Sequence, residues 1–272
     1  MKYYVVADIH GFCSVLKQEL QDKGFFDDTE PHKLIVCGDL FDRGQEAVAL
    51  QEFILELMRK DEIILIRGNH EDLLFRMMDS MEVGIPVLHS YHSRNGTVDT
   101  VRQLVGKDTV WFDTRTDAVL TRLKHTPLMT TIIPSMVDYF ETRNYIFVHG
   151  WIPCHQQKVT TTYSLYEPMD DWRGANEEQW QDARWINGME AAYKGITEPG
   201  KTIVCGHWHT SFGHALYEGK GSVFGGDADY SPYYADGVIA LDACTVYSQK
   251  INCIVIEDED LTDEKGSDNL PS

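Results

Sequence analysis

The chain has 272 residues, of which 43% are hydrophobic and 25% charged, and its formal net charge is −19. This length and apolar content suit one large α/β domain, and the charge excludes a tightly held nucleic-acid duplex, because no basic stripe is present to displace counterions. No apolar run of about 18 residues occurs, so no membrane-spanning helix and no membrane partner are expected.

The amino terminus enters a strand-like run at Lys2, without the charged region, apolar stretch and cleavage site of a signal peptide. We therefore expect a cytoplasmic protein. The six cysteines are scattered and include no C-x-x-C pair. A disulfide framework is not expected for such spacing in that compartment.

The first third of the chain alternates strand-like and helix-like segments. Strands are predicted at 3–7, 33–37 and 62–66, and helices at 12–23, at 45–59 and from about 71. This alternation indicates parallel strands joined by helical crossovers, as in an α/β fold.

Residues from about 80 to 143 break this rhythm with several glycines and prolines between short amphipathic pieces, which predicts a helical cap inserted between strands. Strands are predicted to resume at 145–148 and at 201–205, and 237–256 is predicted to form two strands joined by a turn near Ser248. We expect one domain over residues 1–256. Residues 257–272 carry six net negative charges, and we expect them to form a disordered acidic tail.

Five short motifs carry the chemistry of this chain, and four of them follow apolar, strand-like runs. The motifs are Ala7-Asp8-Ile9-His10-Gly11, Gly38-Asp39-Leu40-Phe41-Asp42-Arg43-Gly44, Gly68-Asn69-His70-Glu71, His149-Gly150 and Gly206-His207-Trp208-His209. Because parallel strands place their carboxyl ends along one edge of a sheet, these segments are expected to converge. Their carboxylate, imidazole and carboxamide groups suit two divalent metals, which can activate water for attack on phosphorus.

The residues beside these ligands suit proton transfer and phosphate binding. His70 follows Asn69 directly and is placed to protonate a leaving oxygen, while Asp42 can orient the imidazole of His70 and raise its pKa. Arg43 can hold two phosphate oxygens. Each motif alone has a simpler explanation, such as a helix cap at Asn69 or a surface ion pair at Asp42 and Arg43. The full set in this order favours a dinuclear site.

The order and spacing of the motifs closely resemble the calcineurin-like metallophosphoesterases. Within that superfamily they resemble the PPP-type serine/threonine protein phosphatases and their bacterial relatives, which include diadenosine tetraphosphatases. The resemblance runs from Asp8 to His209 and more weakly through Ile239-Ala240-Leu241-Asp242. It implies a β-sandwich flanked by helices, in four layers ordered α/β/β/α, with the helical cap inserted. The chain departs from the family pattern at Trp208, where threonine is common.

The resemblance also implies a role for each matching residue. The first metal would be held by Asp8, His10 and Asp39, and the second by Asp39, Asn69, His149 and His207, with Asp39 bridging. His70 and Asp42 would form the acid pair, and Arg43 would bind phosphate together with Asn69. For the second phosphate-binding arginine we choose Arg184, with Arg173 as the runner-up. The cofactors would be two divalent ions, with Mn²⁺ preferred and Fe, Zn or Ni as alternatives.

The function expected on these grounds is hydrolysis of phosphoserine- or phosphothreonine-type esters, by direct attack of a metal-bridging hydroxide. The substrate would be a phosphorylated protein or a small phosphorylated molecule. An alternative is hydrolysis of dinucleoside polyphosphates, which would need a basic or aromatic pocket for a nucleotide. The cap supplies basic residues such as Arg94, and Trp151, Trp172, Trp180 and Trp185 could stack on a base or simply cover the core. A scaffold without catalysis is disfavoured because every catalytic residue type is present. The sequence does not decide whether His209 contacts a metal.

Overall fold

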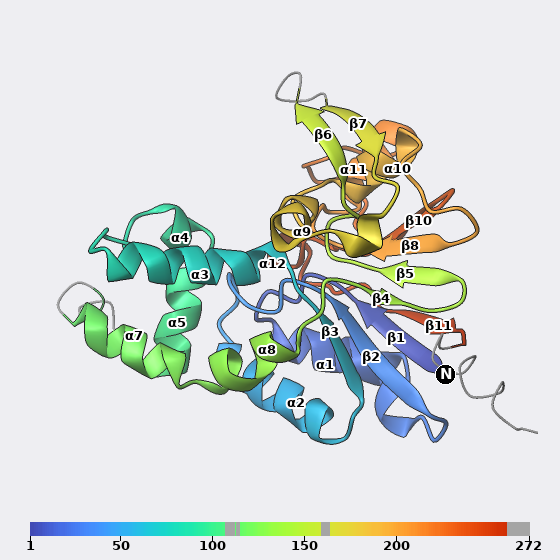
Figure 1. Ribbon diagram of the computed structural model, residues 1–272. Coiled ribbons are helices and arrows are strands. Elements are labelled where there is room, and N and C mark those ends of the chain that lie inside the picture. The colour runs from blue at the N-terminus through green and yellow to red at the C-terminus, as the bar shows by residue number, and fades with distance from the viewer. Residues whose placement is uncertain (107–111, 113–114, 159–163, 260–272) are drawn as a thin grey trace, which may run out of the picture.

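The computed structural model describes residues 1–106, 112, 115–158 and 164–259. Two sheets stack face to face, with helices on both outer surfaces (Figure 1). None of the helices within these residues is long and apolar enough to cross a bilayer. The predicted acidic tail falls almost wholly outside the described residues, which end at Glu259.

The first sheet is built by the amino-terminal third of the chain together with one late strand. Its order is β11 (Ile254–Glu257), β1 (Lys2–Val6), β2 (His32–Cys37) and β3 (Ile63–Ile66). Strands β1, β2 and β3 run parallel, whereas β11 pairs antiparallel with β1. The predicted alternation of strands and helices is thus confirmed, with boundaries shifted by a few residues.

The second sheet comes from the later part of the chain. Its order is β4 (Phe140–Glu141), β5 (Tyr145–Phe147), β8 (Thr202–Cys205), β10 (Val238–Ala240) and β9 (Tyr233–Ala235). The central strands β5, β8 and β10 are parallel, and both edge strands are antiparallel to their neighbours. A separate hairpin of β6 (Cys154–Lys158) and β7 (Ser164–Pro168) was not expected from the sequence.

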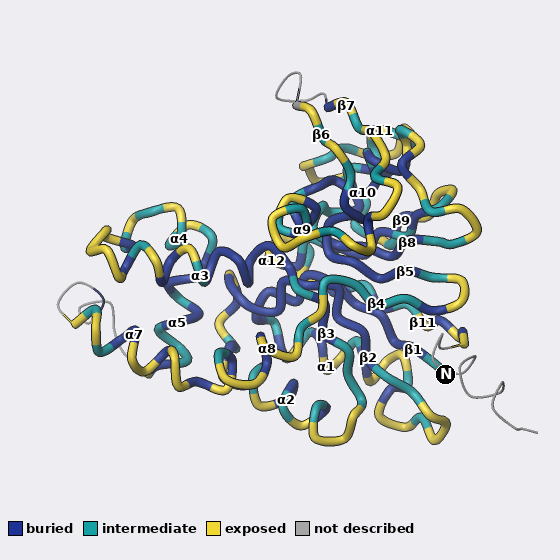
Figure 2. The backbone as a smooth tube through the Cα atoms, viewed as in Figure 1, coloured by how far each residue is buried: buried dark blue, intermediate teal, exposed yellow. Residues whose placement is uncertain are grey.

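Three apolar layers hold this arrangement together. Side chains from both sheets, such as Val5, Ile35, Phe147 and Val204, fill the space between them. Figure 2 shows the strands as the buried centre of the molecule. The outer face of the first sheet is covered by α1 (Cys13–Asp22) and α2 (Ala47–Arg59), and η1 (Phe25–Asp27) follows α1. Helix α2 buries Ala47, Leu50, Phe53, Ile54 and Leu57, the spacing of an amphipathic helix.

The outer face of the second sheet is covered by η3 (Trp172–Gly174), α9 (Glu177–Ala183), α10 (Gly188–Tyr193) and α11 (Ser211–Tyr217). The core there contains Trp151, Trp172 and Trp180. These three tryptophans therefore pack, as the simpler of the two sequence interpretations expected. The four-layer α/β/β/α arrangement is the one implied by the resemblance.

A group of helices follows β3 and precedes β4 along the chain, and much of it projects to one side of the sandwich (Figure 1). It consists of α3 (Asn69–Glu82), α4 (Tyr91–Arg94), α5 (Thr97–Val105), α7 (Thr116–Lys124), η2 (Leu128–Ile132) and α8 (Ile133–Ser135). Its apolar side chains join the core beneath the first sheet. We refer to α4, α5 and α7 as the cap.

Residues 237–256 contain the two expected strands, β10 and the start of β11, with a turn near Ser248. The two strands do not pair with each other, because they belong to different sheets. Between them lies α12 (Thr245–Ser248), a single helical turn that ends at Gln249 with φ of 55°. The chain crosses from one sheet to the other at this point, which a local pattern of apolar residues does not reveal.

Candidate metal centre

The predicted ligands are brought together at the carboxyl ends of the parallel strands. Asp8, Asp39, His149 and His207 each lie two residues beyond the end of β1, β2, β5 and β8, and Asn69 opens α3 just after β3. Asp8, Asp39, Asn69 and His149 are at most 2% exposed. The parallel strands β1, β2 and β3 of the first sheet and β5 and β8 of the second therefore bring these residues to the same edge of the sandwich.

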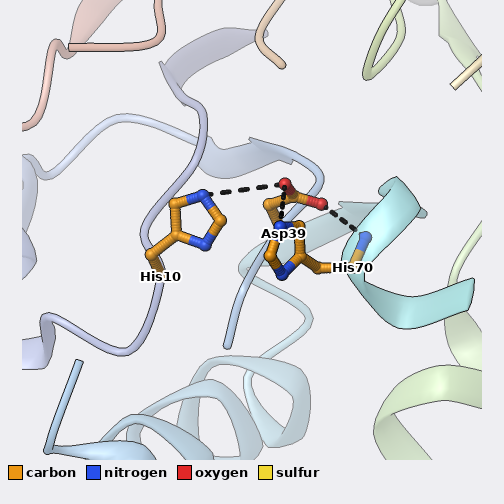
Figure 3. A group of neighbouring side chains, drawn as sticks. All are labelled: His10, Asp39 and His70. Atoms are coloured by element: carbon orange, nitrogen blue, oxygen red, sulfur yellow. Dashed lines mark hydrogen bonds and ion pairs between the residues drawn. The ribbon is translucent and has the colours of Figure 1, made fainter. Parts of the chain in front are cut away.

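Asp39 lies at the centre of the cluster. Its Oδ2 is 3.7 Å from His10 Nε2 and 3.9 Å from His70 Nε2 (Figure 3). Its Oδ1 is 3.4 Å from His149 Nε2. The backbone N–H of His70 donates to Oδ1 at 3.0 Å. Two groups of three residues could each hold a metal, because the ligand atoms within each group lie within 4.8 Å of one another. One triad is His10, Asp39 and His70, and the other is Asp39, His149 and His207. Asp39 belongs to both, as a bridging ligand would.

Backbone carbonyls orient the imidazoles. His10 Nδ1 lies 3.0 Å from the carbonyl of Phe41, and His149 Nδ1 lies 2.8 Å from that of Cys37. Because a carbonyl can only accept, each Nδ1 carries the proton and each Nε2 keeps its lone pair for a metal. Burial lowers the pKa of both rings, and it lowers the pKa of His207 to about 3, so these histidines are neutral.

The donor set fits divalent ions. Asp8 Oδ1 is buried and has no hydrogen-bond partner among the described residues. The Nε2 lone pair of His149 faces Asn69 Oδ1 at 2.7 Å, an arrangement of two acceptors that a cation would stabilise. Burial and the neighbouring carboxylates of Asp242 and Asp39 raise the pKa of Asp8 well above its usual range. A cation at this point would relieve that concentration of negative charge.

The proposed acid pair is formed. His70 Nδ1 lies 2.7 Å from Asp42 Oδ2, and the carboxylate also accepts a hydrogen bond from the Thr97 hydroxyl at 2.8 Å. On the other side of the ring, Arg43 Nη2 lies 3.2 Å from His70 Nε2. Burial lowers the pKa of His70, but the charges of Asp39 and Asp42 outweigh burial and leave the pKa raised.

Glu71, the last residue of the third motif, organises the backbone of the site. Its carboxylate accepts hydrogen bonds from the N–H groups of Gly68, Asp39 and Leu40 at 2.7, 3.2 and 3.1 Å. Burial is the main cause that raises the pKa of Glu71 to about 7. The loop after β2 and the start of α3 are thereby tied to each other.

Arg184, predicted to bind phosphate, is held among carboxylates in the structure. Its side chain is 2% exposed and pairs with Asp72 Oδ2 at 2.8 Å and with Asp138 Oδ1 at 2.6 Å. A contact with phosphate would require the guanidinium to leave these carboxylates. The runner-up, Arg173, is paired with Glu141 and Glu198. Neither arginine lines the cavity over the metal cluster.

A cavity of about 840 Å³ opens over the cluster. Its walls combine two arginines with aromatic rings: Arg43, Arg94, Trp185, Trp208, Phe224 and Tyr247. The ring of Trp185 meets that of His207 edge-on, with centroids 5.7 Å apart. Trp185 thus differs from the three tryptophans in the core, and Arg94, mentioned only as a cap residue from the sequence, lies at the site.

His209 also lines the cavity but belongs to neither metal triad found among the described residues. Its Nδ1 is 2.6 Å from the hydroxyl of Ser211, and its ring packs on Phe224 with centroids 4.5 Å apart. These contacts orient the ring as part of the cavity wall.

Sequence reasoning included Asp242 in the weaker part of the family match but gave it no role. It lies two residues beyond β10, is 7% exposed and lines the cavity. Burial is the largest of the effects that together raise the pKa of the Asp242 carboxyl to about 6. Asp242 follows an apolar strand in the same way as Asp8, Asp39, His149 and His207. The pairing of that strand with β8, which brings Asp242 to the site, has no local signal in the sequence.

The backbone of the site is strained. Ten non-glycine residues in the described part of the chain have positive φ, and six of them belong to the site: Asp8, His10, Asp39, Asp42, Arg43 and His207. The left-handed region is unfavourable for residues with a Cβ, although aspartate and histidine tolerate it better than most. Such outliers gather where surrounding contacts hold a functional geometry in place.

The chain resembles known proteins in sequence and in fold. A sequence profile described as calcineurin-like phosphoesterase matches residues 1–238. Among solved structures, a cold-active protein-tyrosine phosphatase of a psychrophilic Shewanella covers 94% of this chain and 75% of its own, at 15% identity and a TM-score of 0.51. At that identity the likeness concerns the fold alone.

Two curated relatives are described as asymmetrical bis(5'-nucleosyl)-tetraphosphatases. The one from Bacillus velezensis is 30% identical over 91 residues, which are 31% of this chain and 36% of that protein. The one from Oceanobacillus iheyensis is 22% identical over 176 residues, covering 61% of this chain and 64% of that protein. The chain therefore matches less than two thirds of the length of either relative.

Proposed function

The chain belongs to the calcineurin-like phosphoesterase family, whose members hydrolyse phosphate esters, and we propose that it cleaves the phosphoanhydride chain of dinucleoside polyphosphates. The observation that carries this proposal is the cavity over the metal cluster, which offers aromatic rings and a second arginine beside Arg43. From the sequence alone, phosphoserine and phosphothreonine were the preferred substrates. The walls of the cavity favour the alternative.

The residues at the strand ends divide between two ions. Asp8 and His10 would hold the first, and Asn69, His149 and His207 the second, with Asp39 shared between them. The mixed nitrogen and oxygen ligands suit Mn²⁺, and they also admit Fe, Zn or Ni. When bound, the two ions supply a hydroxide nucleophile at neutral pH and stabilise charge on the phosphoryl oxygens.

The chain itself supplies substrate binding and the proton. Arg43 binds oxygens of the reacting phosphate, in keeping with its place beside His70. His70 gives the proton on Nε2 to the departing oxygen, while its Nδ1–H stays on Asp42 at 2.7 Å. Because Arg43 can only donate, its present contact with Nε2 belongs to the unprotonated ring. Arg43 turns from Nε2 toward phosphate when substrate binds.

The walls of the cavity suit a nucleotide. Bases stack on aromatic side chains with a gain of about 1–3 kcal/mol each, and Trp208, Phe224 and Tyr247 are available for this. Arg94 also lines the cavity and can neutralise a phosphate beyond the reacting one. A cavity of about 840 Å³ accommodates one nucleotide end, while the other end extends outward.

A phosphoserine or phosphothreonine phosphatase is the second candidate, and the His70–Asp42 pair favours it. An alkoxide leaving group needs a proton more than a phosphate leaving group does, and this pair is well formed at 2.7 Å. A peptide substrate would not require the aromatic wall. The two candidates thus differ in their use of Trp208 and Arg94.

A Mn²⁺-supplemented assay of purified protein would test the proposal. It would compare kcat/KM for diadenosine tetraphosphate, a phosphothreonine peptide and p-nitrophenyl phosphate. We expect the dinucleotide to be preferred. Arg94→Ala should then lower its kcat/KM about 10- to 100-fold, as for a lost hydrogen bond to a charged group, with little change on p-nitrophenyl phosphate.

Arg115→Ala is the matched control, since it removes the same charge from the residue that precedes α7 and lies outside the cavity. It should leave the kcat/KM of the dinucleotide within about twofold of the unsubstituted protein, as exposed charges contribute little. Preference for the phosphothreonine peptide, with Arg94→Ala inert, would reject the nucleotide proposal in favour of a protein phosphatase.

A further inference from the structure

The cap touches the catalytic loop through the first turn of α5. The Thr97 hydroxyl donates to Asp42 Oδ2 at 2.8 Å, and the backbone N–H of Asp42 donates to the Thr100 hydroxyl at 2.9 Å. Gln103 continues the contact by accepting from Ala47 N at 2.8 Å and donating to Gly44 O at 3.1 Å. One face of a cap helix therefore holds the whole loop that carries Asp42 and Arg43.

The approach of the two segments is close. A Cβ on Gly96, the residue before Thr97, would lie 2.1 Å from the backbone nitrogen of Arg43, and Gly96 adopts φ of 92°. Only glycine fits such a position. Thr97 itself is fully buried, at 0% exposure, so no bulk water can replace its hydroxyl.

The same carboxylate oxygen serves both partners. Asp42 Oδ2 accepts from Thr97 and from His70 Nδ1, at 2.8 and 2.7 Å. Two donors on one oxygen fix the rotation of the carboxylate about its last bond, and the carboxylate in turn fixes the imidazole. Without the hydroxyl, the carboxylate would be held by His70 alone and the ring could tilt with it.

We propose that Thr97 is a positioning residue for proton transfer, which aims His70 Nε2 at the departing oxygen by locking Asp42. This inference rests on the proposed role of His70 as the proton donor. Thr97 neither touches substrate nor exchanges a proton with it. It makes the cap part of the catalytic apparatus, since the helix that carries Thr97 begins three residues after Arg94, on the wall of the substrate cavity.

The test compares two aryl esters in the presence of Mn²⁺. Phenyl phosphate has a poor leaving group that needs protonation, whereas p-nitrophenyl phosphate needs little. Thr97→Val removes the hydroxyl at nearly constant shape. We expect it to lower kcat on phenyl phosphate about 10- to 30-fold, a part of the 100- to 10,000-fold that general acids contribute. On p-nitrophenyl phosphate the change should stay within about threefold, with KM nearly constant for both.

Thr97→Ser, which restores a hydroxyl, should return kcat on phenyl phosphate to within about threefold of the unsubstituted protein. Thr126→Val is the matched control, because Thr126 is another buried threonine of this helical region and its hydroxyl donates to the backbone carbonyl of Leu123, at 2.7 Å. It should not change the ratio between the two esters. If Thr97→Val fails to fold, as judged by its thermal transition, Thr97→Ala carries the same comparison.

His70→Asn separates failure of this inference from failure of the proposed function. If His70→Asn discriminates between the esters and Thr97→Val lowers both equally, Thr97 is only structural and the inference is overturned. If His70→Asn itself lowers both equally, His70 is not the proton donor, and both the proposed role and the inference fall.

Discussion

Arg184 offers the sharpest test of how this site is built, since the resemblance assigns it to phosphate and the structure places it in an ion-pair network. The guanidinium is 2% exposed, and Asp72, which it meets at 2.8 Å, is 3% exposed. Arg184→Met keeps most of the volume and removes the charge. The prediction is a loss of stability without a specific loss of substrate binding.

The expected loss in the free energy of unfolding depends on which partners Asp72 keeps when Arg184 is replaced. Removing one partner of a buried ion pair costs about 3–5 kcal/mol, because the other charge is left uncompensated. Asp72 keeps Arg67 at 2.8 Å, so the lower end, about 3 kcal/mol, applies. With an unfolding entropy of about 2.1 cal/mol/K per residue, a chain of 272 residues should lose about 5 °C in Tm.

Arg173→Met is the matched control. Arg173 also binds two glutamates, Glu141 and Glu198, but its side chain is 37% exposed. Exposed pairs contribute about 1 kcal/mol or less, so its Tm should fall by no more than about 2 °C. Differential scanning calorimetry would give both transitions, and steady-state kinetics would give KM on diadenosine tetraphosphate. An unchanged Tm for Arg184→Met with KM raised tenfold or more would refute the structural role and restore the contact with phosphate.

Three further predictions concern the metal site and its support. Gly206→Ala should abolish metal binding and activity, measured by metal analysis and turnover, because a Cβ there would lie 2.0 Å from Asp8 Oδ2; two bound ions in that variant would contradict the geometry. Chelation should abolish activity and Mn²⁺ should restore it, whereas persistent activity after exhaustive dialysis against chelator would exclude a metal-dependent mechanism. Burial raises the pKa of Asp258, but hydrogen bonds from Asn144 and Thr142 outweigh burial and leave the pKa lowered. The ionised carboxylate therefore stabilises the folded state above the unfolded pKa of about 3.9, and this stabilisation is lost as pH falls. Asp258→Asn should therefore lower the free energy of unfolding by about 1–3 kcal/mol at pH 7 in urea titrations; a difference that did not shrink below pH 4 would show that the charge is irrelevant.

The parts of the site that lie at strand ends were predictable. An apolar run followed by an aspartate, asparagine or histidine identifies both the strand and its functional residue, since carboxyl ends of parallel strands share an edge. The same rule would have found Asp242 after β10, had that strand been placed in the second sheet. The long-range pairing of β10 with β8 is what brings it there, and no local pattern reports such pairing.

The parts that depend on side-chain direction were not predictable. Arg94 and Arg184 look alike in sequence, yet one lines the cavity and the other is buried among carboxylates. The carboxylates that decide this, Asp72 and Asp138, come from distant segments. The role of Thr97 was also not predictable, because it depends on the docking of α5 on the loop after β2. Helix α12 is a single turn, too short to show a helical period.

The left-handed backbone of the metal loops has a consequence for anyone who engineers this protein. Asp8, Asp39 and His207 have φ of 52°, 52° and 67°, each at an estimated cost of about 1–2 kcal/mol. Glycine at such a position removes that cost and also removes the ligand. Thermal tolerance and turnover should therefore move in opposite directions at the same residue. A directed-evolution screen that rewards heat resistance alone would enrich inactive variants, and only a screen that also demands catalysis would keep these loops intact.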